Sequence, residues 1–447
     1  MLREFWDKMD KIFTIYKEWD PVFFFLQGLD GCKDSLFLPT LNNRRKLIRR
    51  LEKLEQDEMI ASLKAQLELF ETHKFLDSLA EALFYYRIKG SSTDKILKKA
   101  IRGLEKLEVE GRAQKILASN AARSLIGTTD DKVFDDTLKR FRKRLGVNYT
   151  SKESIMKNMG PMNRRNYERC VHEIYGIKDS LDDLEEWHEK ELDKAISLHK
   201  PVKLKPVRDI PRTLEEWRSQ VHPLIDTYLL PISGNHNMMI EPVPDSLKDQ
   251  FPVAAAMAVN MFRGDFTNIM FINEDAKSDA YSLLHLLIHE EYGHCVNFSN
   301  STGSLDKLFI ECNIASMEML ATNMEYQFLK LIKSKKIGDP GFRKGYESVF
   351  RKRQVMLHLR ALADIRINTD KTGLGEFVRW AKRKTRIPED QIFREVYGKL
   401  RNPGYSLVYP YGMHLLEKLR KGWDQKRFNE KVWSLGFLPI EELKRRI

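Results

Sequence analysis

The residues of this sequence best suited to chemistry are two histidines and a glutamate in the string H-E-E-Y-G-H. The string begins at His289 and Glu290 and ends at His294. A hydrolytic zinc ion needs three protein ligands and an open position for water. It also needs a carboxylate beside that water to take its proton. The two histidines are therefore candidate zinc ligands, and Glu290 is the candidate general base.

The spacing of these histidines departs from the common H-E-x-x-H pattern, which puts them four residues apart on one helical face. His289 and His294 are five residues apart, and an ideal helix would turn their rings about 140° from each other. The helix must therefore absorb one extra residue, as a π-bulge does at many functional sites. We expect such a bulge here, with Gly293 as the residue best able to adopt distorted backbone.

A third ligand is expected from the helix that follows the motif. Glu318 lies 24 residues after His294, among the small and apolar neighbours of A-S-M-E-M-L-A. A carboxylate in such surroundings is either paired or metal-bound. Glu311 and Glu325 lie seven residues to either side, on nearly the same helical face. One of them could be the ligand instead, and one could orient a histidine by a hydrogen bond.

Two other interpretations of the histidines stay open. One is a helix with surface histidines, an acidic turn and no metal. Against it stand the apolar run at 283–288, the following carboxylate-bearing helix and a preceding strand. The other pairs His285 with His289, which have the ideal four-residue spacing. That pair puts no glutamate in the place of the general base, so we favour His289 with His294.

The elements that must position these residues are mostly helices. Apolar residues recur at spacings of three and four across 44–199, which predicts stacked antiparallel helices. Residues 200–211 hold three prolines and few large apolar residues, which marks a boundary or a crossover. Residues 267–273, T-N-I-M-F-I-N, predict a short strand just before the motif. Helical spacing then resumes from residue 278.

These patterns predict a mainly α fold with two lobes and a short β-sheet beside the motif helix. The expected division is an N-terminal helical lobe at 1–200 and a catalytic domain at 201–447, whose C-terminal part is helical.

The charge of the chain alone does not identify a partner. The 447 residues carry a formal net charge of +12, which suits an acidic partner such as nucleic acid. Basic and acidic residues are interleaved, however, and no basic run is joined to an aromatic stacking motif. A solvated basic surface is therefore favoured over a nucleic-acid partner.

The apolar segments and the cysteines bear on location. No apolar run approaches the roughly 20 residues that span a bilayer, and the first residues lack the apolar core of a signal peptide. The four cysteines form no C-x-x-C pair. We therefore expect no membrane partner and a reducing, cytoplasmic location.

The motif resembles those of the gluzincin metallopeptidases. H-E-x-x-G-H is similar to the zinc motif of the dipeptidyl peptidase III family, which also has one extra residue between its histidines. The second motif of that family, E-E-C-R-A-E, is not evident here. The strings S-M-E-M-L at 316–320 and M-E-Y at 324–326 resemble the third-ligand helix of oligoendopeptidase F and thimet-type oligopeptidases. In those enzymes the glutamate that matches Glu318 binds zinc.

Residues 264–447 also resemble a helical bacterial family of unknown function whose motif is H-E-x-x-P-G-H, with one more residue between the histidines than here. Asn368 stands where that family tends to have a histidine. Its R-x-x-x-D stretch is matched by Arg360 and Asp364. Its tail pattern P-G-x-x-L-x-Y-x-x-G is matched by Pro403, Gly404, Leu407, Tyr409 and Gly412.

The resemblance and the local chemistry together imply a zinc peptidase. Zn²⁺ on His289, His294 and Glu318 would bring the pKa of its bound water towards about 7. Glu290 would take the proton as water attacks a peptide carbonyl and pass it to the leaving amine. The developing oxyanion needs a further donor, for which Tyr409 is the candidate. Tyr411 and His414 are substitutes from the same segment, and a packed core tyrosine is the alternative role for Tyr409.

By analogy, the implied substrates are short or unfolded peptides that enter between helical lobes. An extended peptide could pair with the strand at 267–273 by strand addition. Cleavage preference and oligomeric state stay open. The alternative function is a non-catalytic basic helical scaffold that binds nucleic acid or protein, and a third is a metallohydrolase for another amide or ester.

Overall fold

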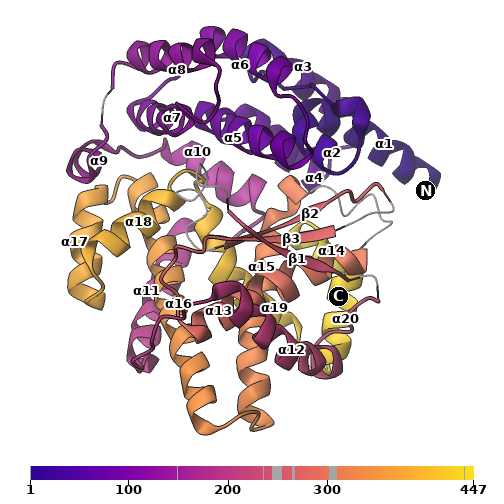
Figure 1. Ribbon diagram of the computed structural model, residues 1–447, viewed down its shortest axis with the longest axis vertical. Coiled ribbons are helices and arrows are strands. Elements are labelled where there is room, and N and C mark those ends of the chain that lie inside the picture. The colour runs from indigo at the N-terminus through magenta and orange to yellow at the C-terminus, as the bar shows by residue number, and fades with distance from the viewer. Residues whose placement is uncertain are drawn as a thin grey trace. The chain divides into compact units, whose positions relative to one another are not determined.

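The structure is a computed structural model that describes residues 2–147, 149–234, 236–243, 254–263, 267–301, 310–436 and 438–447. Helices make up most of it, and the described strands form one three-stranded sheet (Figure 1). This arrangement confirms the predicted mainly α fold with a short β-sheet.

The chain divides into two compact units, each built from two stretches of sequence. Unit 1 comprises Met1–Ile174 and Ala363–Pro403, and unit 2 comprises Tyr175–Leu362 and Gly404–Ile447. This division differs from the expected boundary at 200/201 in two ways. Residues 175–200 belong to unit 2, and a late segment of the chain returns to unit 1.

The described elements of unit 1 are all helices. Its elements are α1 (Leu2–Trp19), α2 (Pro21–Leu26), η1 (Asp30–Cys32), α3 (Leu41–Leu51), α4 (Glu58–Glu68), α5 (Thr72–Ile88), α6 (Asp94–Lys106), α7 (Arg112–Leu125), α8 (Lys132–Leu145), α9 (Lys152–Asn158), α10 (Arg164–Arg169), η2 (Cys170–Ile174), α17 (Leu374–Thr385) and α18 (Glu389–Lys399).

Specific polar contacts tie the late segment into unit 1. The Asn120 amide donates to the Tyr397 hydroxyl at 2.8 Å, so α7 is joined to α18. The fully buried His73 ring donates from Nε2 to the Arg401 carbonyl oxygen, also at 2.8 Å. A pattern of apolar spacings cannot report such pairings between residues hundreds of positions apart, so the sequence did not reveal this return of the chain.

Unit 2 carries the motif. Its elements are α11 (Leu181–Leu198), α12 (Ile210–Tyr228), β1 (Met238–Pro242), β2 (Ala254–Val259), β3 (Thr267–Ile272), α13 (Ala280–Leu287), η4 (Ile288–Cys295), α14 (Val296–Ser301), α15 (Ile310–Ser334), most of α16 (Pro340–Asn368), η6 (Tyr405–Leu407), α19 (Val408–Leu419), α20 (Gln425–Leu435) and α21 (Ile440–Arg446).

Helix α11 belongs to unit 2 because its buried side chains pair there. His188 Nδ1 lies 3.0 Å from Nδ1 of His358 on α16, and both rings are buried. The proline-rich stretch at 200–211 is therefore a crossover within unit 2. It is anchored by the Val207 amide, which donates to the Ser278 carbonyl oxygen at 2.9 Å.

The sheet has the order β1-β3-β2, with β3 parallel to β1 and antiparallel to β2. The predicted strand is confirmed as β3, whose residues are mostly buried. The other two strands were not predicted, because A-A-A-M-A-V in β2 is poor in β-branched residues. Since β3 is paired on both edges, the expectation that it adds a peptide strand is wrong. Among the described strands β2 lies at one end of this order, and it packs on η4.

The helices around the motif are held by caps and close packing. Asp279 begins α13 by accepting hydrogen bonds from the amides of Tyr281 at 3.0 Å and Ser282 at 2.9 Å. Helix α15 packs against η4. It also packs against α19, beside which it lies in Figure 1. A Cβ on Gly412 would lie 2.5 Å from the Met319 side chain, so α19 approaches α15 as closely as glycine allows. These contacts bring the motif, α15 and the tail segment to one place.

No helix among the described residues is long and apolar enough to cross a membrane.

Candidate metal centre

The motif lies on a π-helical segment, η4, between α13 and α14. This confirms the predicted bulge. The extra residue per turn brings the rings of His289 and His294 to the same side. Their ring centroids lie 4.9 Å apart and the ring planes are perpendicular, at 90°.

Gly293 serves a different purpose from the one expected. Its φ is not in the left-handed region, so the bulge does not depend on the special backbone freedom of glycine. A Cβ on this residue would instead lie 2.6 Å from Cα and Cβ of Ala321 on α15. Gly293 therefore allows the close approach of α15, which carries the third candidate ligand.

Glu318 reaches both histidines from α15. Its Oε2 lies 3.3 Å from His289 Nε2 and 3.7 Å from His294 Nε2. The candidate ligand atoms of these three residues all lie within 4.8 Å of one another, and among the described residues no other such group forms. All three are buried, with 6–7% of their surface exposed.

This donor set fits a zinc ion. Ligand atoms about 2.0–2.1 Å from a tetrahedral zinc lie about 3.3–3.5 Å from one another, close to the separations seen here. Two imidazoles and a carboxylate are also the ligands of many catalytic zinc sites. Glu318 Oε2 is buried and accepts no hydrogen bond, and a buried carboxylate oxygen of this kind normally has a partner.

The other two glutamates of α15 have different positions. The side chain of Glu311 lies outside the described residues. Glu325 Oε1 accepts a hydrogen bond from His289 Nδ1 at 2.7 Å, and its Oε2 lies 3.1 Å from His285 Nε2. Glu325 thus orients the His289 ring so that Nε2 faces Glu318. His285 contacts the far side of this carboxylate and does not join His289 in a ligand group.

The carboxylates create a strong negative potential at the first histidine. Burial by itself lowers the pKa of His289, but the adjacent carboxylates of Glu318 and Glu325 outweigh it and raise the pKa to about 10. Burial dominates at His294 and lowers its pKa to about 4. Burial disfavours the charged form of Glu318, yet the His289 ring beside its carboxylate holds the pKa of Glu318 well below its usual range. A potential that favours a cation on an imidazole also favours a dication between imidazoles.

Glu290 lies next to this group and is partly exposed, unlike its neighbours in the motif. Its Oε2 accepts a hydrogen bond at 3.2 Å from the amide of Ala256 on β2. Burial raises the pKa of the Glu290 carboxyl, and the charge of His289 opposes this rise. A raised carboxylate pKa is the direction that improves a general base near neutral pH.

Two tyrosines of the tail segment lie against the cluster. The Tyr409 ring is 6.5 Å from the His289 ring, with an interplanar angle of 20°. Sequence reasoning missed Tyr405, whose hydroxyl donates to Glu318 Oε1. The two hydroxyls are also hydrogen-bonded to each other. The signal that could have found Tyr405 is its position four residues before Tyr409.

The two substitutes for Tyr409 lie in another part of unit 2. The Tyr411 hydroxyl donates to Asp179 at 2.5 Å, and the His414 ring packs on Trp187 at a centroid distance of 5.0 Å. Residues two and five positions after Tyr409 point to other faces of α19. The structure therefore gives neither side chain a contact with the histidine–glutamate group.

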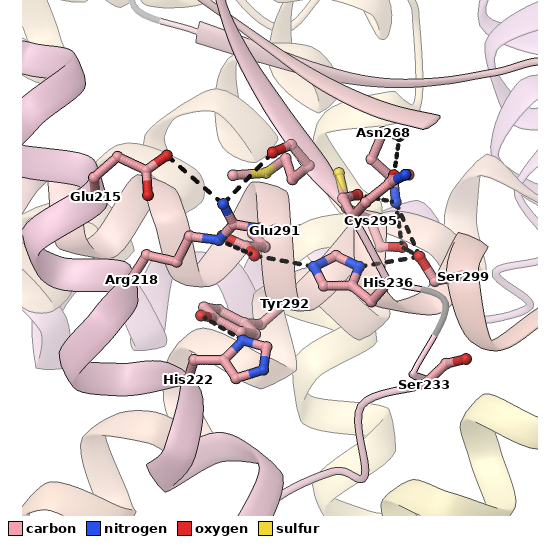
Figure 2. Close-up of polar contacts among 12 residues, drawn as sticks. Glu215, Arg218, His222, Ser233, His236, Asn268, Glu291, Tyr292, Cys295 and Ser299 are labelled. Atoms are coloured by element: carbon pink, nitrogen blue, oxygen red, sulfur yellow. Dashed lines mark hydrogen bonds and ion pairs between the residues drawn. The ribbon is translucent and has the colours of Figure 1, made fainter. Parts of the chain in front are cut away.

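The opposite face of η4 carries a separate polar network (Figure 2). Glu291 is fully buried, and its Oε1 accepts hydrogen bonds from Arg218 Nε at 2.9 Å and His236 Nε2 at 3.0 Å. Figure 2 shows these two side chains reaching the carboxylate from opposite sides. The other nitrogen of His236 lies 3.0 Å from the Ser299 hydroxyl, which also accepts from the Asn268 amide at 2.9 Å.

Two solved structures resemble the fold of almost the whole chain. The sequence matches no family model and no curated protein. A solved structure titled "putative lipoprotein" from Colwellia psychrerythraea matches with a TM-score of 0.60 and 12% identity, covering 98% of this chain and 96% of its own. Another, a "putative lipoprotein of unknown function" from Shewanella oneidensis, matches with a TM-score of 0.66 and 11% identity, covering 98% of both chains. At these identities the likeness concerns the fold alone.

Proposed function

We propose that this chain is a zinc-dependent peptidase that hydrolyses short or unfolded peptides. The observation that carries the proposal is the buried group of His289, His294 and Glu318, with the partly exposed Glu290 beside it. The resemblance of the motif and of the Glu318 helix to gluzincin metallopeptidases supports the same chemistry. The polar face around Glu291 has no counterpart to this ligand set among the described residues.

His289, His294 and Glu318 would hold the ion. When bound, zinc supplies Lewis-acid polarisation of a carbonyl and acidifies a water molecule. Glu325 fixes the tautomer of His289 by accepting its Nδ1 proton. Tyr405 limits the freedom of Glu318 by donating to its second oxygen.

Proton transfer falls to Glu290. Its carboxylate accepts the proton of the attacking water and later returns it to the leaving amine. The Ala256 amide holds this carboxylate in place. Burial raises the pKa of Tyr409 well above its usual value, so its hydroxyl keeps its proton and can donate to a developing oxyanion.

The outer edge of β2 is the place where we infer that an extended peptide adds. This strand lies beside η4, and four of its six residues are alanine. Small side chains let a peptide backbone approach the edge, and the Ala256 amide is already directed at Glu290. Main-chain hydrogen bonds of this kind bind unfolded segments and exclude folded ones.

The test combines metal analysis with a matched pair of variants, Glu290→Gln and Glu291→Gln. The purified protein should hold about one zinc per chain and hydrolyse a peptide library. Glu290→Gln should keep the zinc and lose turnover by at least roughly 10²–10⁴-fold, the size of a general-base contribution. Glu291→Gln changes the neighbouring carboxylate, on the other face, and should retain both zinc and turnover per folded molecule.

Retained turnover in Glu290→Gln would refute the assigned base. Absence of stoichiometric zinc, together with salt-sensitive RNA or DNA binding, would favour the scaffold function instead.

A further inference from the structure

Unit 1, which contains none of the candidate zinc ligands, has a hollow that gathers four cations. Its volume is about 470 Å³, within the range of about 300–1,000 Å³ that is usual for small-ligand pockets. All of its lining residues belong to unit 1. Helices α3 and α6 form its walls. The four cationic residues are Lys46 on α3 and Lys99, Arg102 and Lys106 on α6.

The local sequence puts the α6 cations on one face of that helix. They follow one another at spacings of three and four residues, which defines a helical face. The segment at 36–38 packs on the same face, because a Cβ on Gly103 would lie 2.5 Å from the Leu38 side chain. The Asn43 amide, at the start of α3, donates to the Leu38 carbonyl oxygen at 2.8 Å. The hollow is therefore built from two helices and a segment that is fixed to both.

The four positive charges are not neutralised by carboxylates in the part of the chain that the structure describes. Lys99 Nζ donates to the Asp34 carbonyl oxygen at 2.6 Å. Arg102 Nε donates to the Lys98 carbonyl oxygen at 3.2 Å. Both acceptors are neutral, so these hydrogen bonds position the side chains and leave their charges in place. None of the four cations forms an ion pair with a described acidic residue.

The next cations along the same two helices are paired, in contrast. One turn farther along α3, Arg50 Nη1 lies 2.6 Å from Glu18 Oε2. One turn earlier on α6, Lys95 Nζ lies 2.8 Å from Asp34 Oδ2. Glu18 is the only acid among the described residues that line the hollow, and Arg50 already balances its charge. The hollow therefore keeps the positive charges of its own four cations.

Phosphate groups fit this charge and these donors. A phosphate monoester carries about −1.5 to −2 at neutral pH, so two phosphate groups come close to balancing four cations. A lysine ammonium binds phosphate as a point charge, and an arginine fork binds it through two parallel hydrogen bonds. Lys46, Arg102 and Lys106 are exposed, so a ligand from solvent reaches both walls. A single phosphate would leave about half of the charge unbalanced.

Apolar side chains also line the hollow, and one of them is aromatic. These residues are Leu36, Phe37, Leu38 and Leu47. Phe37 is partly exposed and contacts no other aromatic ring among the described residues. Such rings stack nucleobases, whose planar faces need no matching hydrogen bonds. Asn43 adds an amide group to the lining, which suits the hydroxyls of a sugar better than a hydrocarbon chain.

We propose that this hollow binds a nucleoside diphosphate. The four cations hold the two phosphates from both walls, and the base stacks on Phe37. The site is independent of the proposed peptidase function, because it uses residues of unit 1 alone.

The test titrates the full chain by calorimetry with ADP, GDP and UDP, with their monophosphates and with inorganic pyrophosphate. The tightest nucleoside diphosphate should bind at least about 10-fold more tightly than its monophosphate, because the second phosphate adds hydrogen bonds to charged groups. It should bind about 5- to 100-fold more tightly than pyrophosphate, which is the contribution of one stacked base.

Four variants locate the bound ligand. Lys46→Met and Arg102→Met, one on each wall, should each weaken nucleoside diphosphate binding by about 10- to 100-fold. Phe37→Leu keeps an apolar side chain, so it should weaken nucleoside diphosphate binding and leave pyrophosphate binding unchanged. Lys98→Met is the control, since Lys98 is exposed on α6 and does not line the hollow. It removes the same charge from the same helix and should bind like the wild-type chain. Thermal unfolding shows that each variant is folded.

Four results would overturn the proposal. An equal loss of affinity in Lys98→Met and Arg102→Met would show only a general attraction of anions to a basic surface. Pyrophosphate binding as tight as that of any nucleoside diphosphate, with no effect of Phe37→Leu, would remove the base from the site. Tighter binding of single-stranded RNA than of every nucleoside diphosphate would assign the cations to a longer polyanion. Failure of all these probes to bind would end the assignment and leave the peptidase function untouched.

Discussion

Glu290 and Glu291 are neighbours in the sequence, yet they face two different regions of unit 2. Glu290 is partly exposed, lies beside the histidine–glutamate group and accepts a hydrogen bond at 3.2 Å from a strand amide. Glu291 is fully buried on the other face of η4, where Arg218 and His236 donate to it at 2.9 and 3.0 Å.

The difference separates groups that hold the fold from groups that could react. Oε1 of Glu291 already accepts hydrogen bonds from two side chains, and among the described residues this network forms no group of candidate metal ligands. The group around Glu318 differs, since its three candidate ligand atoms lie within 4.8 Å of one another beside the partly exposed Glu290. The contacts on the Glu291 face of η4 thus help to hold the π-helical backbone that brings the two candidate histidine ligands together on the other face.

The largest effect is expected from removing a ligand. His294→Ala should weaken zinc binding by on the order of 10²–10³-fold, because a structural zinc gains roughly 10–16 kcal/mol from about four ligands. His285→Ala, the matched control, should keep the metal, since His285 contacts only the far side of Glu325. Zinc retention against a competing chelator measures both. Loss in His285→Ala with retention in His294→Ala would show that the pair of His285 with His289 is the real one.

A substitution on the Glu291 face of η4 should lower the stability of the protein and leave its zinc content unchanged. Glu291→Gln should lower the free energy of unfolding by about 2–3 kcal/mol, because it removes a buried charge from two charged donors. Glu215→Gln is the control, since Glu215 is exposed and lies 3.6 Å from the same arginine, and such surface pairs contribute about 0–1 kcal/mol. Urea unfolding compares the two. A fall in zinc stoichiometry in folded Glu291→Gln would contradict the division of roles between the faces.

The contact between η4 and α15 leaves no room for an added methyl group at Gly293. Gly293→Ala should cost about 1–3 kcal/mol of stability, because the new Cβ meets the backbone of Ala321 and the helices must move apart. Gly398→Ala is the control, since Gly398 lies in α18 with open space around it. There alanine should stabilise by up to about 1 kcal/mol. Equal and small effects at both positions in thermal unfolding would argue against the close approach.

The smallest effect is expected from the hydroxyl that supports Glu318. Tyr405→Phe should weaken zinc binding by about tenfold, the lower end for a residue that orients a ligand. Tyr411→Phe removes a hydroxyl that donates to Asp179 instead, and it should leave zinc affinity unchanged. Titration with a fluorescent zinc chelator resolves this difference. Equal affinities for both variants would remove Tyr405 from the support of the centre.

The sequence alone determined the mainly helical class, the strand at 267–272, the bulge between the histidines and the candidate set of His289, His294 and Glu318. These follow from local rules, because residue spacing and side-chain type already restrict what a helix or a strand can present. The five-residue spacing is the sharpest example, since two rings at that spacing can meet only if the backbone departs from the α-helix.

Tertiary structure alone decided which α15 glutamate faces which histidine, that Tyr405 contacts Glu318, and that Gly293 is needed for packing. It also decided that His414 and Tyr411 lie elsewhere, that β3 is central in the sheet, and that residues 363–403 return to unit 1. Each of these depends on contacts between residues far apart in the chain. Such contacts are selected by how whole faces of helices fit together, and no single stretch of sequence contains that information.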